Sequence, residues 1–325
     1  MNEEILLQVN NLSVEYPDGT RAVNSVSFTL KKGEILGIIG ESGSGKSTVA
    51  LSIMMLLPEG TKINGSIIYA GKDLTKLSHT ELREIRGKEI SLIFQDSLSS
   101  FDPVIRVGKQ IIERAIDDGI MDNITATKKA IDILRSLGVT YPELRLKSFP
   151  HELSGGLRQR AFITMSTFLD PKILIADEPT TSLDVIAQKQ LIDQIKRMKY
   201  NGISVIFITH DIALASSFCD KLLIIYGGYV MEYGKTDELI RDPFHPYTDG
   251  LINVIPMISN IEKGLRIMKG SLPNPKELPS GCIFWPRCDY AKEKCKIEKP
   301  PLSEIKNGRY VACFYPEEVR LKRKS

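Results

Sequence analysis

One eight-residue stretch limits the possible folds of this chain more than any other feature. Residues 40–47 read Gly-Glu-Ser-Gly-Ser-Gly-Lys-Ser and fit the pattern G-x-x-x-x-G-K-[ST]. The apolar run 35–39 before it predicts a buried strand, and residues 48–56 after it predict a helix. A glycine-rich turn between a strand and a helix lets successive backbone N–H groups surround phosphate oxygens. The stretch therefore predicts a phosphate site in an α/β fold.

The residue types in this loop also predict what each position does. The side chain of Lys46 would reach the β- and γ-phosphates of a nucleotide, and the hydroxyl of Ser47 would bind Mg²⁺. The other residues that we expect around the phosphates are Gly40, Glu41, Ser42, Gly43, Ser44, Gly45 and Thr48.

Length and composition place this loop in a globular protein with more than one core. A chain of 325 residues favours two domains, or one large domain with an appendage. Charged residues make up 26%, and a net charge of +3 gives no indication of nucleic-acid binding. The sequence contains no apolar run of membrane-spanning length, and its first residues lack the pattern of a secretory signal. We therefore expect a cytoplasmic protein whose membrane link, if any, comes through a partner.

The chain on either side of the loop predicts a mixed sheet with an inserted helical part. Residues 4–30 alternate as strands do and are broken by a Pro-Asp-Gly turn at 17–19. Further along, strands and helices alternate, which predicts a mostly parallel sheet with right-handed crossovers. Residues 105–148 have helical spacing, so we expect a helical subdomain at roughly 97–165.

Polar residues at three predicted strand ends are candidates for chemistry on the phosphates. The apolar run 172–176 ends in Asp177 and Glu178, and two acids at a buried strand end are costly unless a metal or a proton transfer uses them. The first acid would hold Mg²⁺, and the second would polarise the attacking water. Gln95 ends the run 90–94, and His210 ends the run 204–209 on the side of an α/β sheet where ligands bind.

A second helix start is also suited to an anion. Ser154, Gly155 and Gly156 directly precede a predicted helix, whose N-terminal N–H groups favour negative charge. Such a Ser-Gly-Gly segment by itself is more often a loop than a site.

The cysteines are unevenly distributed. Four of the five, Cys282, Cys288, Cys295 and Cys313, lie in the last fifth of the chain, in a proline-rich segment. In a reducing compartment such a cluster points to metal rather than to disulfides. The spacing is neither the C-x₂-C pairing of structural zinc nor the ferredoxin run, and four thiolates suit either an iron–sulfur cluster or zinc.

Taken together, residues 5–245 resemble the ATP-binding subunit of an ABC transporter. The motifs occur in the family's order: Walker A at 40–47, the Q-loop residue Gln95, the signature at 153–157, Walker B at 173–178, the D-loop at 182–184 with Asp184, and the switch residue His210. Tyr16 matches the aromatic residue that stacks on adenine. Leu157 departs from the glutamine of many members, at a position that matters less than the preceding Ser-Gly-Gly.

The resemblance implies a fold, an activity and a set of partners. It implies a P-loop NTPase of the ABC type over residues 1–245, with a RecA-like core, an N-terminal antiparallel β part and the helical subdomain. It implies hydrolysis of ATP with Mg²⁺, with Glu178 as general base and His210 on the γ-phosphate. Two such subunits would enclose two ATP molecules, the phosphate loop of one facing Ser154–Gly156 of the other, and two membrane permeases and an external solute-binding protein would complete the transporter at the cytoplasmic face of the membrane.

The C-terminal part narrows the resemblance. His245-Pro246-Tyr247-Thr248 and the Gly-Cys…Pro-Arg-Cys arrangement resemble the oligopeptide/dipeptide and nickel importer branch. That branch implies a small irregular regulatory domain over 246–325, a heterodimer with a second ATPase, and a [4Fe–4S] cluster on the four C-terminal cysteines, with zinc as the alternative.

Three functions stay open. Peptide import leads, nickel or oligosaccharide import is the alternative within the class, and a soluble ABC-type ATPase of translation or DNA repair is the alternative from another class. The last is disfavoured because the chain has one phosphate loop and no sustained heptads.

Overall fold

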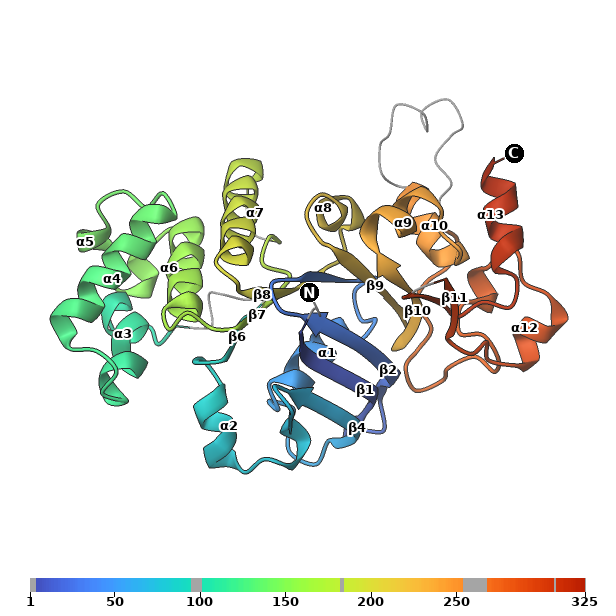
Figure 1. The fold of residues 1–325 in the computed structure, drawn as a ribbon, viewed down its shortest axis with the longest axis horizontal. Coiled ribbons are helices and arrows are strands. Elements are labelled where there is room, and N and C mark those ends of the chain that lie inside the picture. Colours follow the sequence, from blue (N-terminus) through green and yellow to red (C-terminus); the bar gives the residue numbers. More distant parts are fainter. Residues whose placement is uncertain (1–3, 95–100, 182–183, 254–267, 307, 325) are drawn as a thin grey trace. The chain divides into compact units, whose positions relative to one another are not determined.

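The computed structural model describes residues 4–94, 101–181, 184–253, 268–306 and 308–324 (Figure 1). The chain divides into two compact units. Unit 1 comprises Met1–Leu77 and Phe207–Ser325, and unit 2 comprises Ser78–Ile206. The boundary between the two units falls within strand β8 (Ser204–Thr209).

The first sheet of unit 1 is the antiparallel part that the sequence predicted. Its strands run in the order β2-β1-β4-β5. Their bounds are β1 (Ile5–Glu15), β2 (Arg21–Lys31), β4 (Lys62–Tyr69) and β5 (Lys72–Asp73), and the short 3₁₀ turn η1 (Leu74–Lys76) follows. Leu7 and Val9 are buried on β1, as are Leu12 and Val14, and a register shift separates the two pairs. The shift is a bulge that keeps one face of the strand apolar and inward.

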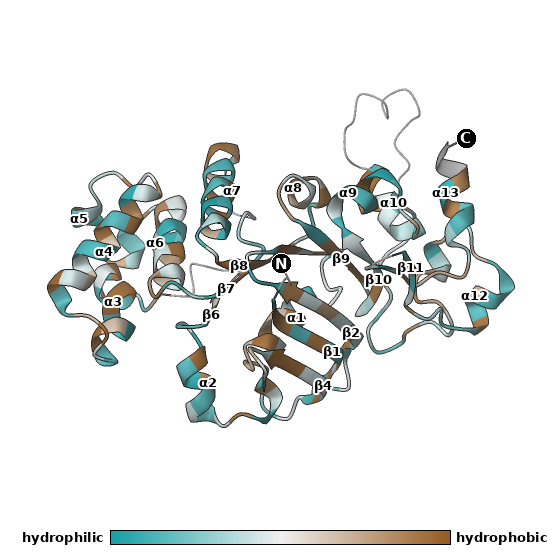
Figure 2. Ribbon diagram, in the orientation of Figure 1, coloured by the Kyte–Doolittle hydropathy of each residue, from teal (hydrophilic) through white to brown (hydrophobic). Residues whose placement is uncertain are grey.

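The second sheet of unit 1 carries the phosphate loop. Its strands β3 (Ile35–Ile39) and β9 (Lys221–Tyr226) are parallel, and β10 (Tyr229–Lys235) pairs antiparallel with β9. All five residues of β3 are buried, and most of β9 carries the hydrophobic colour in Figure 2. Such continuous apolar runs are typical of strands that are covered on both faces. The helices of this part are α1 (Lys46–Ile53), α8 (Ile212–Ser216), α9 (Thr236–Arg241) and α10 (Pro246–Asn253).

The C-terminal segment is more regular than the sequence predicted, because it extends this sheet. Strand β12 (Arg309–Val311) pairs antiparallel with β10, and β11 (Ser303–Lys306) pairs with β12. The other elements of the segment are η3 (Trp285–Arg287), α12 (Glu293–Ile297) and α13 (Pro316–Lys324). Proline and glycine content predicted an irregular tail, but the partner strand β10 lies about 75 residues upstream, and local composition carries no information on such pairing.

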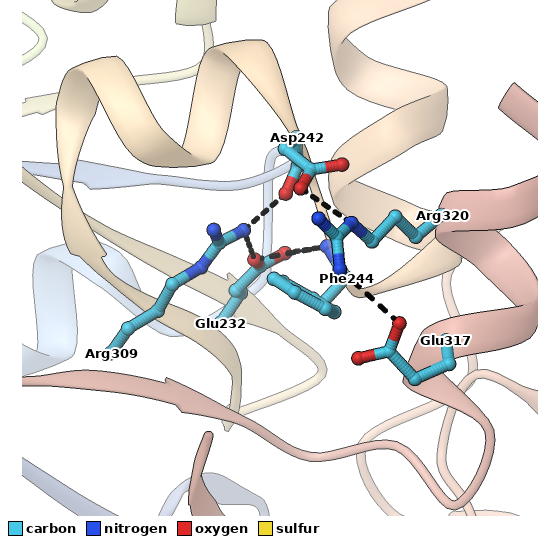
Figure 3. Close-up of polar contacts among 6 residues, drawn as sticks. All are labelled: Glu232, Asp242, Phe244, Arg309, Glu317 and Arg320. Carbon is cyan, nitrogen blue, oxygen red and sulfur yellow. Dashed lines mark hydrogen bonds and ion pairs between the residues drawn. The ribbon is translucent and has the colours of Figure 1, made fainter. Parts of the chain in front are cut away.

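A buried ion pair fastens the C-terminal segment to β10 (Figure 3). Arg309 on β12 donates to the carboxylate of Glu232 on β10 at 2.8 Å, and the two side chains are 4% and 0% exposed. The same carboxylate accepts the backbone N–H of Phe244 at 3.1 Å. Removing one member of a buried pair leaves an uncompensated charge, at a cost of about 3–5 kcal/mol. The segment is therefore an integral part of unit 1.

Unit 2 contains the helical part and two parallel strands. Strands β6 (Ile90–Ile93) and β7 (Ile173–Asp177) pair in parallel register, and all their residues are buried. The helices are α2 (His79–Ile85), α3 (Val107–Asp117), α4 (Asn123–Ser136), α5 (Pro142–Arg145), α6 (Gly155–Thr167) and α7 (Val185–Tyr200), with the 3₁₀ turn η2 (Pro150–Glu152). Helices α3 to α6 lie together in Figure 1, in agreement with the helical subdomain that the sequence predicted there. No helix among the described residues is long and apolar enough to cross a membrane.

Candidate functional site: a phosphate loop and a carboxylate pair

The phosphate loop of unit 1 has the strand–loop–helix form that the motif requires. It connects β3 to α1, and Gly45 is the N-cap of α1 with φ +99°. A Cβ atom on Gly45 would lie 2.2 Å from the carbonyl oxygen of Ala22, and one on Gly40 would lie 2.2 Å from that of Ile225. Glycine is therefore required at both positions. No side chain caps α1, so its first N–H groups are not satisfied by a cap and suit an anion.

Lys46 lies inside this loop. Its side chain is buried, and Nζ donates to the carbonyl oxygens of Gly40 and Glu41, both at 2.9 Å. These contacts hold the ammonium group against the loop backbone. Ser47 is exposed at the start of α1, where its hydroxyl is accessible to a metal ion. A nucleotide and Mg²⁺ thus fit the donor set of the loop.

The remaining loop positions divide into an exposed tip and a buried base. Ser42 and Gly43 are exposed, whereas the Ser44 side chain is buried and its carbonyl oxygen accepts the N–H of Gly228 at 2.9 Å. The hydroxyl of Thr48 lies 3.0 Å from the hydroxyl of Tyr16, in a part-buried position. The structure thus brings Tyr16 next to the phosphate loop, and stacking on adenine stays a prediction.

The carboxylate pair of unit 2 lies at the end of β7. Asp177 and Glu178 are 7% and 9% exposed. Glu178 has φ +45°, a left-handed conformation that costs a non-glycine residue about 1–2 kcal/mol. Its Oε2 accepts the hydroxyl of Thr181 at 3.2 Å. Buried acids and backbone strain at one strand end are typical of functional sites.

The second predicted anion site, also in unit 2, is the start of α6. Ser154 is the N-cap, and its hydroxyl accepts the N–H of Leu157 at 3.4 Å. Ser154 and Gly155 are exposed, and a Cβ atom on Gly155 or Gly156 would meet no heavy atom within 4 Å. This helix start is therefore accessible to a ligand or to another subunit.

The structure describes the local surroundings of two further predicted residues. Asp184 caps α7, with its carboxylate accepting the N–H of Ala187 at 2.8 Å, and is exposed. His210 is exposed directly after β8. Gln95 and the first two D-loop residues, 182 and 183, lie outside the described residues.

The four C-terminal cysteines line one small cavity of about 20 Å³ in unit 1. The other lining residues are mostly aromatic or proline, with His245: Pro246, Phe284, Trp285, Tyr290, Pro300, Phe314 and Tyr315. Burial raises the pKa of Cys288 to about 12 and that of Cys313 to about 11, and it raises the pKa of Cys282 as well. Cys219 is buried elsewhere, behind β3 near Gly37.

This cavity does not support the predicted metal site. Among the residues with described positions, no group of three or more His, Cys, Asp or Glu side chains could hold a metal ion. The expectation of a [4Fe–4S] cluster, or of zinc, is therefore not supported by the structure. In the metal-free protein the apolar cavity keeps these thiols neutral, because burial disfavours the thiolate form.

Sequence reasoning missed two contacts to the phosphate loop, from Arg287 and Tyr247, and a third residue, Tyr226, that contacts Arg287. Arg287 in η3 donates through Nη1 to both carboxylate oxygens of Glu41, at 2.9 and 3.0 Å. The hydroxyl of Tyr247 accepts the N–H of Glu41 at 3.0 Å, and the hydroxyl of Tyr226 lies 3.3 Å from Arg287 Nη1. Arg287 lies next to Cys288 in the Pro-Arg-Cys segment. It is 246 positions from Glu41 along the chain, so no local sequence pattern could predict their contact.

Comparison with known proteins identifies the family. The ABC transporter family model matches residues 23–181, and the model for the C-terminal region of oligopeptide/dipeptide transporters matches residues 231–295. The oligopeptide transport ATP-binding protein OppD of Salmonella typhimurium is 42% identical over 98% of this chain and 96% of its own length. The chain belongs to the ABC transporter ATP-binding subunits, in the oligopeptide branch. It is therefore an ABC-type ATPase.

Other relatives agree with this assignment. The oligopeptide transport ATP-binding protein AppD of Bacillus subtilis is 42% identical over 96% of this chain and 97% of its own. A solved dimeric ATP-binding cassette in a post-hydrolysis state with ADP and phosphate matches with a TM-score of 0.65 and 27% identity, covering 71% of this chain and 99% of that one. The ABC-type fold that the sequence predicted is confirmed.

Proposed function

We propose that this ATPase supplies the energy for import of oligopeptides through a membrane transporter. The observation that carries the proposal is the identity of 41–42% to oligopeptide transport subunits along nearly the whole chain, including the C-terminal segment. An ATPase domain alone would match transporters of many cargoes, whereas the C-terminal match is to the oligopeptide/dipeptide group. Nickel and oligosaccharides remain alternative cargoes.

In this proposal the predicted site residues have separate roles in binding and hydrolysing ATP. Lys46 binds the β- and γ-phosphates, and Ser47, Gln95 and Asp177 hold Mg²⁺ or its water. Glu178 accepts a proton from the attacking water, and His210 contacts the γ-phosphate. Burial of Lys46 and Glu178 supports these roles, since a charge in a poorly solvated site acts strongly on the charge that develops in the reaction.

The subunit arrangement is part of the proposal. Two ATPase subunits would close on ATP, with Ser154, Gly155 and Gly156 of one facing the phosphate loop of the other. The exposure of that helix start supports the arrangement. The γ-phosphate adds negative charge that only ATP brings to the interface, so its loss on hydrolysis would open the dimer. A related second ATPase, two permeases and an external solute-binding protein are the proposed partners, and they would place the chain at the cytoplasmic face of the membrane.

A single substitution tests the catalytic assignment. Glu178→Gln keeps the size of the side chain and removes its basicity, so we expect ATP to bind while turnover falls by about 100-fold or more. ATP hydrolysis by the assembled transporter and ATP binding by the isolated chain are the two measurements. Hydrolysis at the wild-type rate would contradict the role of Glu178.

Co-purification and transport test the physiological role. Permeases that co-purify with the chain, together with ATP-dependent uptake of labelled peptides into vesicles, would support peptide import. Uptake of nickel or of an oligosaccharide instead would change the cargo, and ribosomes or DNA in the purified complex would favour the soluble ATPase of translation or repair.

The predicted cluster on Cys282, Cys288, Cys295 and Cys313 needs its own test. The shared cavity of the four thiols is the observation in its favour. Against it stands the finding that, among the described residues, no group of three or more His, Cys, Asp or Glu side chains could hold a metal ion. Purification without oxygen, an iron and zinc assay and a visible spectrum distinguish the cases. About four iron atoms per chain would support the cluster, and one zinc ion per chain would support the zinc site instead. A metal-free protein would contradict both predictions.

A further inference from the structure

We propose that Arg287, in the C-terminal segment, is a positioning residue for ATP binding that neutralises and holds Glu41 of the phosphate loop. The proposal rests on the proposed binding of triphosphate at this loop. It concerns how a residue 246 positions away sets the strength of that binding.

The first observation is the geometry of the pair. One nitrogen of Arg287, Nη1, is within hydrogen-bond distance of both oxygens of the Glu41 carboxylate. The two side chains are 7% and 29% exposed, so this ion pair is largely shielded from water and from salt. A shielded pair with a charge-assisted hydrogen bond is stronger than the exposed ion pairs of a protein surface.

The second observation is that Arg287 is itself fixed. Its Nε donates to the carbonyl oxygen of Lys269 at 2.8 Å, and its guanidinium group lies 5.5 Å from the ring centre of Tyr226 and 6.0 Å from that of Phe284. Burial disfavours the charge of Arg287, but Tyr226 and Glu41 outweigh it and the pKa of the guanidinium group is raised. The group is therefore a fixed positive charge.

The third observation is that the same part of the molecule also holds the backbone at Glu41. The hydroxyl of Tyr247 accepts the N–H of Glu41. The rings of Tyr226, Tyr247 and Phe284 pack against one another, with centres 4.8–5.4 Å apart. Glu41 is thus fixed through both its side chain and its backbone, next to the carbonyl oxygens that hold Lys46.

The contact between Arg287 and Glu41 affects nucleotide binding through electrostatics. Glu41 is an acid within a loop that binds a polyphosphate, and an unpaired carboxylate there would repel the ligand. Two unit charges about 8 Å apart at an effective dielectric constant of about 20 interact with about 2 kcal/mol, which is more than a tenfold change in affinity. Arg287 removes this repulsion and keeps the loop in one conformation.

A double-mutant cycle tests the proposal in the full-length chain. The four proteins carry no change, Arg287→Gln, Glu41→Gln or both changes, all in the Glu178→Gln background that slows turnover. The dissociation constant for MgATP is measured by calorimetry. We expect Arg287→Gln to weaken binding by about tenfold or more, and the same change in the Glu41→Gln protein to weaken it by less than about twofold. Arg287→Lys keeps the charge and should recover most of the affinity.

A matched control separates this role from folding. Lys292 lies in the same segment and pairs with Glu318, and both side chains are about half exposed. Lys292→Gln should leave MgATP binding unchanged. An equal loss from Arg287→Gln with and without Glu41 would show that Arg287 does not act through Glu41, and it would overturn the proposal. A loss that follows the unfolding midpoint across the set would also overturn it. If the unmutated loop binds no MgATP, the proposed function fails instead.

Discussion

The phosphate loop and the cysteine cavity lie in the same unit and are built on opposite principles. The loop is made by backbone atoms, and its glycines and helix start present N–H groups to an anion. The cavity is made by side chains, and aromatic rings surround four thiols whose burial disfavours charge. The first environment suits a highly charged ligand, whereas the second suits neutral groups.

The comparison shows when a sequence motif predicts local structure. In the phosphate loop, consecutive residues determine the backbone conformation, so the motif predicts the strand, loop and helix that the structure contains. In the cavity, the four cysteines come from positions up to 31 residues apart, and their surroundings decide their protonation state. Three sets of variants test this contrast, in order of decreasing effect.

The largest effect is expected from Lys46 in the phosphate loop, with Lys299 of the C-terminal segment as the control. Lys46→Ala removes the charge that meets the β- and γ-phosphates, and we expect MgATP affinity to fall by about 100-fold or more. Lys299→Ala removes a lysine of the C-terminal segment, whose Nζ contacts the hydroxyl of Tyr229 at 2.7 Å, and should leave the affinity unchanged. Nucleotide titration of both variants measures the contrast. Equal affinities for the Lys46 variant and the wild type would refute the phosphate site.

A smaller effect is expected from one glycine in each region. Gly45→Ala and Gly281→Ala both place a Cβ atom at positive φ, 2.2 Å from the Ala22 oxygen and 2.4 Å from the Cys295 oxygen respectively. Each should lose more than about 2 kcal/mol of unfolding free energy because the backbone must move. Only Gly45→Ala should also lose MgATP binding.

Denaturant unfolding with nucleotide titration distinguishes these outcomes. Gly19→Ala is the control, since its φ is +82° but no atom lies within 4 Å of the new Cβ atom. It should cost only about 1 kcal/mol. A Gly281→Ala protein that loses nucleotide binding while remaining folded would show that the two regions are more tightly coupled than we describe.

The smallest effect is expected from pH. Burial lowers the pKa of His245 at the cysteine cavity to about 3, and a hydrogen bond to the backbone of Ala312 acts in the opposite direction. The folded state keeps this imidazole neutral, while the unfolded chain protonates it near pH 6.5. Stability should therefore fall as pH drops from about 6.5 towards 3, by about 2 kcal/mol at pH 5.

The matched variant isolates this contribution. Burial raises the pKa of the neighbouring Glu232, which works against the effect of His245 because the folded state then binds a proton more readily. His245→Gln leaves Glu232 in place, so the difference between the two pH profiles of unfolding free energy reports His245 alone. Parallel profiles would contradict the assignment.

The sequence by itself determined the features that consecutive residues control. The loop 40–47, the buried strand before it and the helix after it follow from glycine conformation and local periodicity, and so does the acid pair at the end of β7. The turn at 17–19 and the helices of 107–167 belong to the same class.

Only the tertiary structure decided what distant segments do to one another. It joined β12 to β10, put His245 among the four cysteines, and brought Arg287 to Glu41. These contacts depend on packing between segments far apart along the chain, where the free energy comes from burial and charge pairing rather than from local conformation. For that reason the strand, the glycine-rich loop and the helix at 35–53 could be predicted, whereas the surroundings of the thiols and the partner of Glu41 could not.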